Sequence, residues 1–189
     1  MSQQNTVGGK DTLVNQLLVI KLAFLGESTV GKTSIVHKFV NYEFQENREQ
    51  TINGAFLTQK CRLGDKIIRF EIWDIVDRKS YHTLIYRNAH VVVVVYDVTN
   101  VDSFDKAKSL IRELKSQVDP KVVIFLVGNK IDLSERQVPT EEVKDYALEF
   151  GLLFYETSAK TDDGIRTIFT KIAEKFVSDD SFPAEENVD

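Results

Sequence analysis

Eight residues near the start of the chain, Gly26 to Thr33, have the types and the spacing of a phosphate-binding loop. They read GESTVGKT, which fits the pattern Gly-x4-Gly-Lys-Ser/Thr. In such a loop the backbone N–H groups and the dipole of the following helix hold an anion. Lys32 would reach the β- and γ-phosphates of a nucleotide, and the hydroxyl of Thr33 would bind Mg²⁺. The alternative is a glycine-rich turn that binds nothing.

The segments on either side of this loop favour phosphate binding. Residues 17–25 (LLVIKLAFL) form a near-continuous apolar run, which is typical of a strand buried on both faces. After the loop, the sequence SIVHKFV has its apolar residues at helical spacing. A strand, a glycine-flanked loop and a helix are the context that the motif requires. The residues expected around the phosphates are Glu27, Ser28, Thr29, Val30, Gly31, Lys32, Thr33 and Ser34.

A second group of polar residues, Asn129-Lys130-Ile131-Asp132, follows an expected strand and could select the base. The carboxylate of Asp132 can accept two hydrogen bonds from the N1–H and the exocyclic amine of guanine. Adenine offers no such pair of donors, so this carboxylate would discriminate between the two purines. Lys130 can lie flat over the ring, and Asn129 can tie this segment to the phosphate loop.

A third segment, Thr157-Ser158-Ala159-Lys160, follows the next expected strand. The backbone N–H groups of Ser158, Ala159 and Lys160 can reach O6 of guanine. Each of these tetrapeptides alone resembles an ordinary surface Asx-turn. Three matches in the right order, each placed after a strand, form a far more specific pattern and predict a guanine nucleotide.

The rest of the chain alternates strands with helices. Further strands are expected at residues 55–63, 66–74, 90–96, 122–127 and 152–155, and helices at 102–118, 140–150 and 165–176, with Thr140 as an N-cap. This order predicts an α/β fold with a six-stranded, mostly parallel sheet, one antiparallel strand and helices on both faces. Ligands bind such sheets at the carboxyl ends of the strands, where the three polar segments lie. We expect a flexible tail at 1–16, one domain at 17–177 and an acidic tail at 178–189.

Composition limits the class of protein. The 189 residues are 42% hydrophobic and 28% charged, with a net charge of −5, which gives no electrostatic reason to expect nucleic-acid binding. Cys61 is the only cysteine, so an internal disulfide is excluded, and a buried or half-buried strand position is expected for it. No apolar run is long enough to span a membrane, and the first residues are too polar for a signal peptide. A cytoplasmic location is expected.

With these motifs the chain resembles the Ras-like small GTPases, and more closely the Rab family. The resemblance covers about residues 17–177. It includes Ile52, Phe56, the run RFEIWD at 69–74, YRNA at 86–89 and VVYDVTN at 94–100. The runs GESTVGKTSIV, AFLTQ and LLFYETSAK are most similar to the early-endosomal branch, which organises endocytic fusion. The resemblance implies the P-loop NTPase (small GTPase) fold, GTP and GDP as ligands with Mg²⁺, and a monomeric switch that reaches endosomal membranes through partners.

The same resemblance assigns roles to further residues. Phe44 would stack on the guanine, Thr51 would bind Mg²⁺ and the γ-phosphate, and Asp74 would hold Mg²⁺ through water. An aromatic patch of Phe56, Trp73 and Tyr86 would be read by effectors, exchange factors and GTPase-activating proteins. The alternative for this patch is ordinary packing between a strand and a helix. The alternation along residues 68–73 turns Trp73 outward, which favours an interface.

The chain departs from the family at residues 74–79, which read DIVDRK where the family has Asp-Thr-Ala-Gly-Gln-Glu. Asp77 replaces the glycine whose N–H binds the γ-phosphate, and Arg78 replaces the glutamine that orients the attacking water. The segment at residues 81–86 is a few residues shorter than in the family, and Asn53 replaces a glycine of the family. Lys32 and Arg78 are the candidate catalytic residues, and slow hydrolysis is expected because an arginine has no acceptor for water. The alternative is an outward-pointing loop that tolerates change.

The C-terminus also differs from the family, because it ends ENVD without the cysteines that Rabs prenylate. We therefore expect no intrinsic membrane anchor in this sequence, either because the protein is soluble or because the chain has been shortened. The leading hypothesis is a Rab-type switch with weak or absent GTPase activity. A second hypothesis is a scaffold that holds GDP or GTP permanently and docks partners through Phe56 and Trp73. An ordinary, fully active GTPase is the third.

Overall fold

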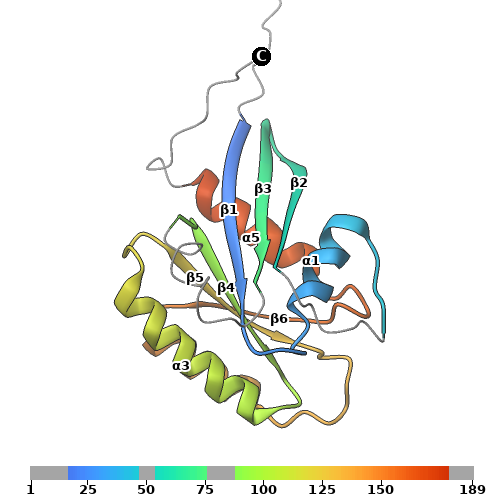
Figure 1. Cartoon of the computed structure of the whole chain (residues 1–189), viewed down its shortest axis with the longest axis vertical. Coiled ribbons are helices and arrows are strands. Elements are labelled where there is room, and N and C mark those ends of the chain that lie inside the picture. Colours follow the sequence, from blue (N-terminus) through green and yellow to red (C-terminus); the bar gives the residue numbers. More distant parts are fainter. Residues whose placement is uncertain (1–16, 47–53, 76–87, 179–189) are drawn as a thin grey trace, which may run out of the picture.

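A sheet with strand order β2-β3-β1-β4-β5-β6 forms the centre of the molecule. The computed structural model describes residues 17–46, 54–75 and 88–178 (Figure 1). Its strands are β1 (Leu17–Leu25), β2 (Ala55–Leu63), β3 (Lys66–Asp74), β4 (Val91–Asp97), β5 (Val123–Asn129) and β6 (Leu153–Thr157). Its helices are α1 (Lys32–Asn41), α3 (Val101–Gln117), α4 (Thr140–Glu149) and α5 (Ile165–Val177).

The predicted fold class is confirmed. Only the β2–β3 pair is antiparallel among the described strand pairs, and its strands are joined by a turn at Gly64 and Asp65. The two tails at residues 1–16 and 179–189 lie outside the described residues, as do residues 47–53 and 76–87. The tail boundaries therefore stay predictions.

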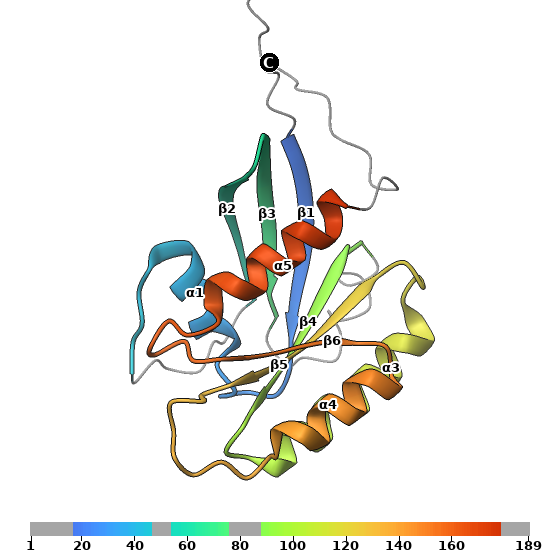
Figure 2. The same cartoon turned by 180° about the vertical axis from the view of Figure 1, so that it is seen from behind.

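Two hydrophobic clusters cover the sheet, one on each of its faces. One contains Ile35 of α1 and Phe169 of α5, and the other contains Phe104 of α3 and Val143 of α4. The rear view shows α5 crossing the sheet with α1 beside it (Figure 2). All seven residues of β4 are buried, since this strand is covered on both sides. The helices thus fix the strand ends from both faces, which positions the loops that follow them.

The ends of two strands differ from the sequence prediction. β5 continues through Asn129 and β6 through Thr157, and these two residues pair in the ladder. The prediction stopped both strands earlier because their polar last residues break the apolar run. Asn129 and Thr157 are therefore held by the sheet itself, while Lys130, Ser158 and the residues after them leave it.

The N-cap predicted for α4 is wrong. Thr140 is the first helical residue, Pro139 occupies the cap position, and no side chain caps this helix. The Thr140 hydroxyl donates instead to Glu156 Oε1 at 3.0 Å and accepts from Arg136 at 3.1 Å. A charge-assisted partner on β6 competes with the local cap. The first turn of α4 carries two acids, Glu141 and Glu142, where the helix dipole favours negative charge.

None of the helices in the described part of the chain has the length and apolar character needed to cross a membrane.

Candidate nucleotide-binding site

The predicted phosphate loop lies between the end of β1 and the start of α1. Gly26 and Gly31 have φ angles of 140° and 99°, a region that favours glycine. A Cβ at Gly26 would lie 2.3 Å from the carbonyl oxygen of Val95, and one at Gly31 would lie 2.2 Å from Nδ2 of Asn129. Both glycines are thus required by close packing as well as by backbone conformation. Gly31 is also the N-cap of α1 and supplies no side chain to its first N–H groups, which leaves that role to an anion.

The side chain of Lys32 reaches back to the first residues of this loop. Its Nζ donates to the carbonyl oxygens of Gly26 at 2.6 Å and Glu27 at 2.8 Å, and the residue is only 8% exposed. These contacts hold the ammonium group beside the backbone nest at the start of α1. Its charge would there balance the phosphates of a nucleotide.

The structure brings together two of the three predicted magnesium ligands. The hydroxyl of Thr33 donates to Oδ2 of Asp74 at 2.5 Å, and Asp74, the last residue of β3, is buried. A hydroxyl and a carboxylate are hard oxygen ligands, which Mg²⁺ prefers. Where the structure describes the chain, no three His, Cys, Asp or Glu side chains gather to hold a metal by themselves. This fits Mg²⁺, which takes few protein ligands and completes its shell with water and phosphate.

Asn129 joins the three predicted segments. Its Nδ2 donates to the carbonyl oxygen of Val30 in the phosphate loop at 2.9 Å. Its Oδ1 accepts from the hydroxyl of Thr157 at 3.2 Å and from the N–H of Ala159 at 3.3 Å. The residue is 2% exposed, so these bonds are shielded from water. One amide therefore fixes the predicted phosphate loop and the two segments predicted to read the base relative to each other.

Lys130 and Asp132 leave the sheet in the direction of solvent. Lys130 has a φ of 71°, and its Nζ forms an ion pair with Oδ2 of Asp97 at 2.6 Å. Oδ1 of the exposed Asp132 accepts a hydrogen bond from the hydroxyl of Ser158 at 2.6 Å. The same hydroxyl accepts from the N–H of Thr161 at 3.0 Å. The carboxylate proposed to read guanine is thus oriented by a buried serine.

Asp97 was missed as a site residue by the sequence analysis. It ends β4 and pairs in register with Asn129 of β5. An acidic residue after an apolar strand does not by itself indicate a functional site. The available signal was its place at the same sheet edge as the other polar residues, since parallel strands end together there.

The remaining predicted residues lie around this centre. Glu27 forms an ion pair with Lys106 of α3, and Lys160 forms one with Glu46 at 2.6 Å. The hydrogen bond from Lys160 to Glu46 raises the pKa of this lysine. Phe44 is partly buried against the cluster of α1 and α5. Thr51, Arg78 and Tyr86 lie outside the described residues, as does Asp77.

The outward orientation predicted for Trp73 is confirmed. Trp73 and Phe56 face each other across β2 and β3, are 40% and 49% exposed, and have ring centroids 4.6 Å apart. Cys61 has the half-buried strand position expected for it, and burial raises the pKa of its thiol. The first two aromatic residues of the predicted patch therefore form a surface outside the nucleotide site.

Comparison with known proteins shows the family of this chain. The family model described as "Ras family" matches residues 21–178. The chain is similar to the Ras-related protein Rab-5A of Dictyostelium discoideum, with 46% identity over 165 residues, which cover 85% of this chain and 82% of the relative. The chain belongs to the Ras family of small GTPases, and within that family to the Rab proteins.

Proposed function

We propose that this protein is a Rab-type switch that binds GTP and GDP with Mg²⁺, acts in endosomal vesicle traffic and hydrolyses GTP slowly. The observation that carries the nucleotide part is the hydrogen bonding of Asn129, which joins the phosphate loop to both base-reading segments. A protein without a nucleotide has no evident need for this rigid connection between three loops. The endosomal part rests on the similarity to Rab-5A.

Each part of a guanine nucleotide has a matching group. The start of α1 and Lys32 would hold the phosphates, and Asp132 would accept from the guanine edge. Thr33 and Thr51 would bind Mg²⁺ and Asp74 would hold it through water, and the metal would neutralise charge on the β- and γ-phosphates. Phe44 and Lys130 would contact the base, and the backbone of Ser158, Ala159 and Lys160 would approach its O6.

Hydrolysis requires an attacking water in line with the γ-phosphorus. The water oxygen forms a bond to the γ-phosphorus and gives up a proton, which the phosphate products or the solvent take. The bond between the γ-phosphorus and the oxygen that bridges it to the β-phosphorus breaks, and GDP and inorganic phosphate leave. Arg78 stands at the position of the family's water-orienting glutamine, and its guanidinium has donors but no acceptor. Asp77 would bring negative charge toward the phosphates. The γ-phosphate sensor is therefore altered, while the predicted groups for guanine and the metal are retained.

The first experiment is to denature the purified protein and identify the released nucleotide by chromatography. Guanine nucleotide at a substantial fraction of the protein concentration is expected, and a protein free of nucleotide that binds ATP and GTP equally would contradict the proposal. Single-turnover hydrolysis should then be slow. Replacing Asp77 by Gly and Arg78 by Gln together should accelerate it, whereas equal rates would mean that the altered loop has no effect.

A second candidate function is a scaffold that holds its nucleotide permanently. The exposed pair of Phe56 and Trp73 favours partner docking in either case. The two functions differ in nucleotide exchange. A scaffold should release GDP too slowly for regulation even when Mg²⁺ is removed, whereas release from a switch should accelerate, since its phosphates lose a counter-charge.

A further inference from the structure

The two carboxylate oxygens of Asp97 have different partners. Oδ1 accepts from the N–H of Thr99 at 2.9 Å and from its hydroxyl at 2.7 Å. Oδ2 forms the ion pair with Lys130 Nζ at 2.6 Å. Because Oδ1 is already fixed by Thr99, the direction in which Oδ2 points is set before Lys130 binds to it.

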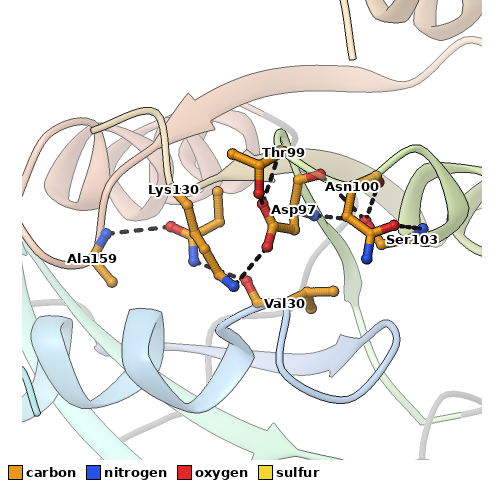
Figure 3. A network of polar contacts seen from close by, with 8 residues as sticks. Val30, Asp97, Thr99, Asn100, Ser103, Lys130 and Ala159 are labelled. Carbon is orange, nitrogen blue, oxygen red and sulfur yellow. Dashed lines mark hydrogen bonds and ion pairs between the residues drawn. The ribbon is translucent and has the colours of Figure 1, made fainter. Parts of the chain in front are cut away.

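The backbone that carries Asp97 is also fixed. Its N–H donates to the hydroxyl of Ser103 at 3.0 Å, and that hydroxyl donates to the carbonyl oxygen of Asn100 at 2.7 Å. Asn100 caps α3 by accepting from the N–H of Ser103 at 3.1 Å. Next to Asp97, the N–H of Val98 donates to the carbonyl oxygen of Asn129 at 3.0 Å. Figure 3 shows this chain of contacts from the start of α3 to Lys130.

Lys130 is the residue whose conformation depends on the fixed carboxylate of Asp97. Its φ of 71° lies in the left-handed region, which is uncommon for a residue with a Cβ. Its side chain is 31% exposed and has four rotatable bonds, so without a partner it would sample many directions. The Asp97 side chain is only 11% exposed, which limits screening of the pair by solvent. An ion pair to a pre-oriented, poorly hydrated carboxylate therefore restricts where the lysine stem lies.

We propose that Asp97 is a positioning residue for base binding, which holds the stem of Lys130 in place over the guanine site. Asp97 itself does not touch the nucleotide. This proposal deepens the proposed function and rests on it. The competing explanation is an ion pair that stabilises the fold without affecting the base.

The test is a double-mutant cycle on GDP binding with Asp97→Asn and Lys130→Met. Asn keeps an acceptor for Thr99 and the volume of the side chain, and replaces the charged oxygen that Lys130 uses by an amide NH₂, which cannot accept from the lysine. We expect Asp97→Asn to accelerate release of a fluorescent GDP analogue about tenfold. In the Lys130→Met background the same change should have almost no further effect, because the lysine through which it acts is gone.

A matched control is Glu156→Gln. Glu156 forms an ion pair with Arg136 at 2.7 Å, in which the side chains are 21% and 32% exposed, and none of its described polar contacts reaches the nucleotide loops. The Glu156→Gln variant measures how the loss of a comparable ion pair changes the stability of the fold. It should lower the melting temperature about as much as Asp97→Asn and leave GDP release unchanged.

The outcomes separate this inference from the proposed function. If the unmutated protein binds no guanine nucleotide, the proposed function is wrong. If it binds GDP and Asp97→Asn releases it at the same rate, the positioning role is overturned while the proposed function stands. An effect of Asp97→Asn that persists in full beside Lys130→Met, or that Glu156→Gln reproduces, would equally overturn the positioning role, since the carboxylate would then act through the fold.

Discussion

The side-chain amide of Asn129 donates a hydrogen bond of 2.9 Å to the backbone carbonyl of Val30, a residue 99 positions earlier in the chain. The same side chain accepts from Ala159, 30 positions later. Three loops from three different strands thus depend on one buried amide. Their relative positions are set in the protein itself, before a ligand arrives, which lowers the ordering cost of binding.

Asn129→Ala should loosen this connection. The change leaves the Val30 carbonyl and the Ala159 N–H without their partner, at a cost of about 1–3 kcal/mol for each group that stays buried. We expect GDP release to accelerate by at least about tenfold and the free energy of unfolding to fall. The matched control is Asn41→Ala, because Asn41 is exposed and its side-chain amide forms a hydrogen bond with His37, outside the three loops. If Asn129→Ala releases GDP no faster than Asn41→Ala, the hydrogen bonds of Asn129 do not support nucleotide binding.

Asp132→Asn should change the preferred base. If Asp132 accepts from N1–H and the exocyclic amine of guanine, an amide in its place offers a donor where guanine also has one. Xanthine carries an oxygen at that position, so the variant should gain affinity for xanthine nucleotides and lose affinity for GTP. Competition of XDP and GDP for both proteins measures the shift. The amide can still accept from Ser158, so the loop should keep its conformation. An unchanged preference for guanine would contradict the assigned role.

Much of this arrangement was predictable from the sequence, for a physical reason. The limits of β1, β2 and β3 follow from apolar runs and alternation that end at charged or turn residues. The polar segments after the strands had to meet, because parallel strands end at one edge of the sheet. The meeting of Thr33 with Asp74 follows from this rule, since β1 and β3 pair in parallel.

Other features depended on side-chain partners that no local pattern reveals. Thr140 has the residue type of an N-cap, but Arg136 and Glu156 compete for its hydroxyl. Asp97 has the type of a surface acid, and its role depends on the register that sets it beside Asn129 and on the left-handed turn at Lys130. Both cases involve contacts between segments that are separated in the sequence, which periodicity does not encode.

Thr33→Asn should weaken binding of GTP more than binding of GDP. The hydroxyl of Thr33 lies 2.5 Å from Oδ2 of Asp74, where Thr33 could bind one Mg²⁺ directly and Asp74 could hold it through water. The triphosphate depends on this metal more strongly, because its charge is greater. Affinities for GTP and GDP should be measured with Mg²⁺ and with EDTA, using Ser109→Ala, a change of an exposed hydroxyl on α3, as the control. A GTP affinity that keeps its full dependence on Mg²⁺ in Thr33→Asn would exclude Thr33 as a ligand.

Tyr96→Phe should leave stability unchanged or increase it. The Tyr96 side chain is fully buried against Phe104 of α3 and against Gly128, and its hydroxyl has no hydrogen-bond partner among the described residues. Burial, reinforced by Glu156, raises the pKa of this phenol, which favours its neutral form. An unsatisfied buried hydroxyl costs about 1–3 kcal/mol, and phenylalanine removes that cost while it keeps the ring.

The control for this prediction is Tyr146→Phe, because the Tyr146 hydroxyl donates to the carbonyl oxygen of Lys108 at 3.3 Å. Loss of a satisfied hydrogen bond should lower the free energy of unfolding by about 0.5–1.5 kcal/mol. Denaturant titration of both variants in the presence of excess GDP measures the two changes under the same conditions. The expected order places Tyr96→Phe at or above the unmutated protein and Tyr146→Phe below it. If Tyr96→Phe falls as far as the control, its hydroxyl has a partner such as a buried water, and that hydroxyl supports the contact between β4 and β5.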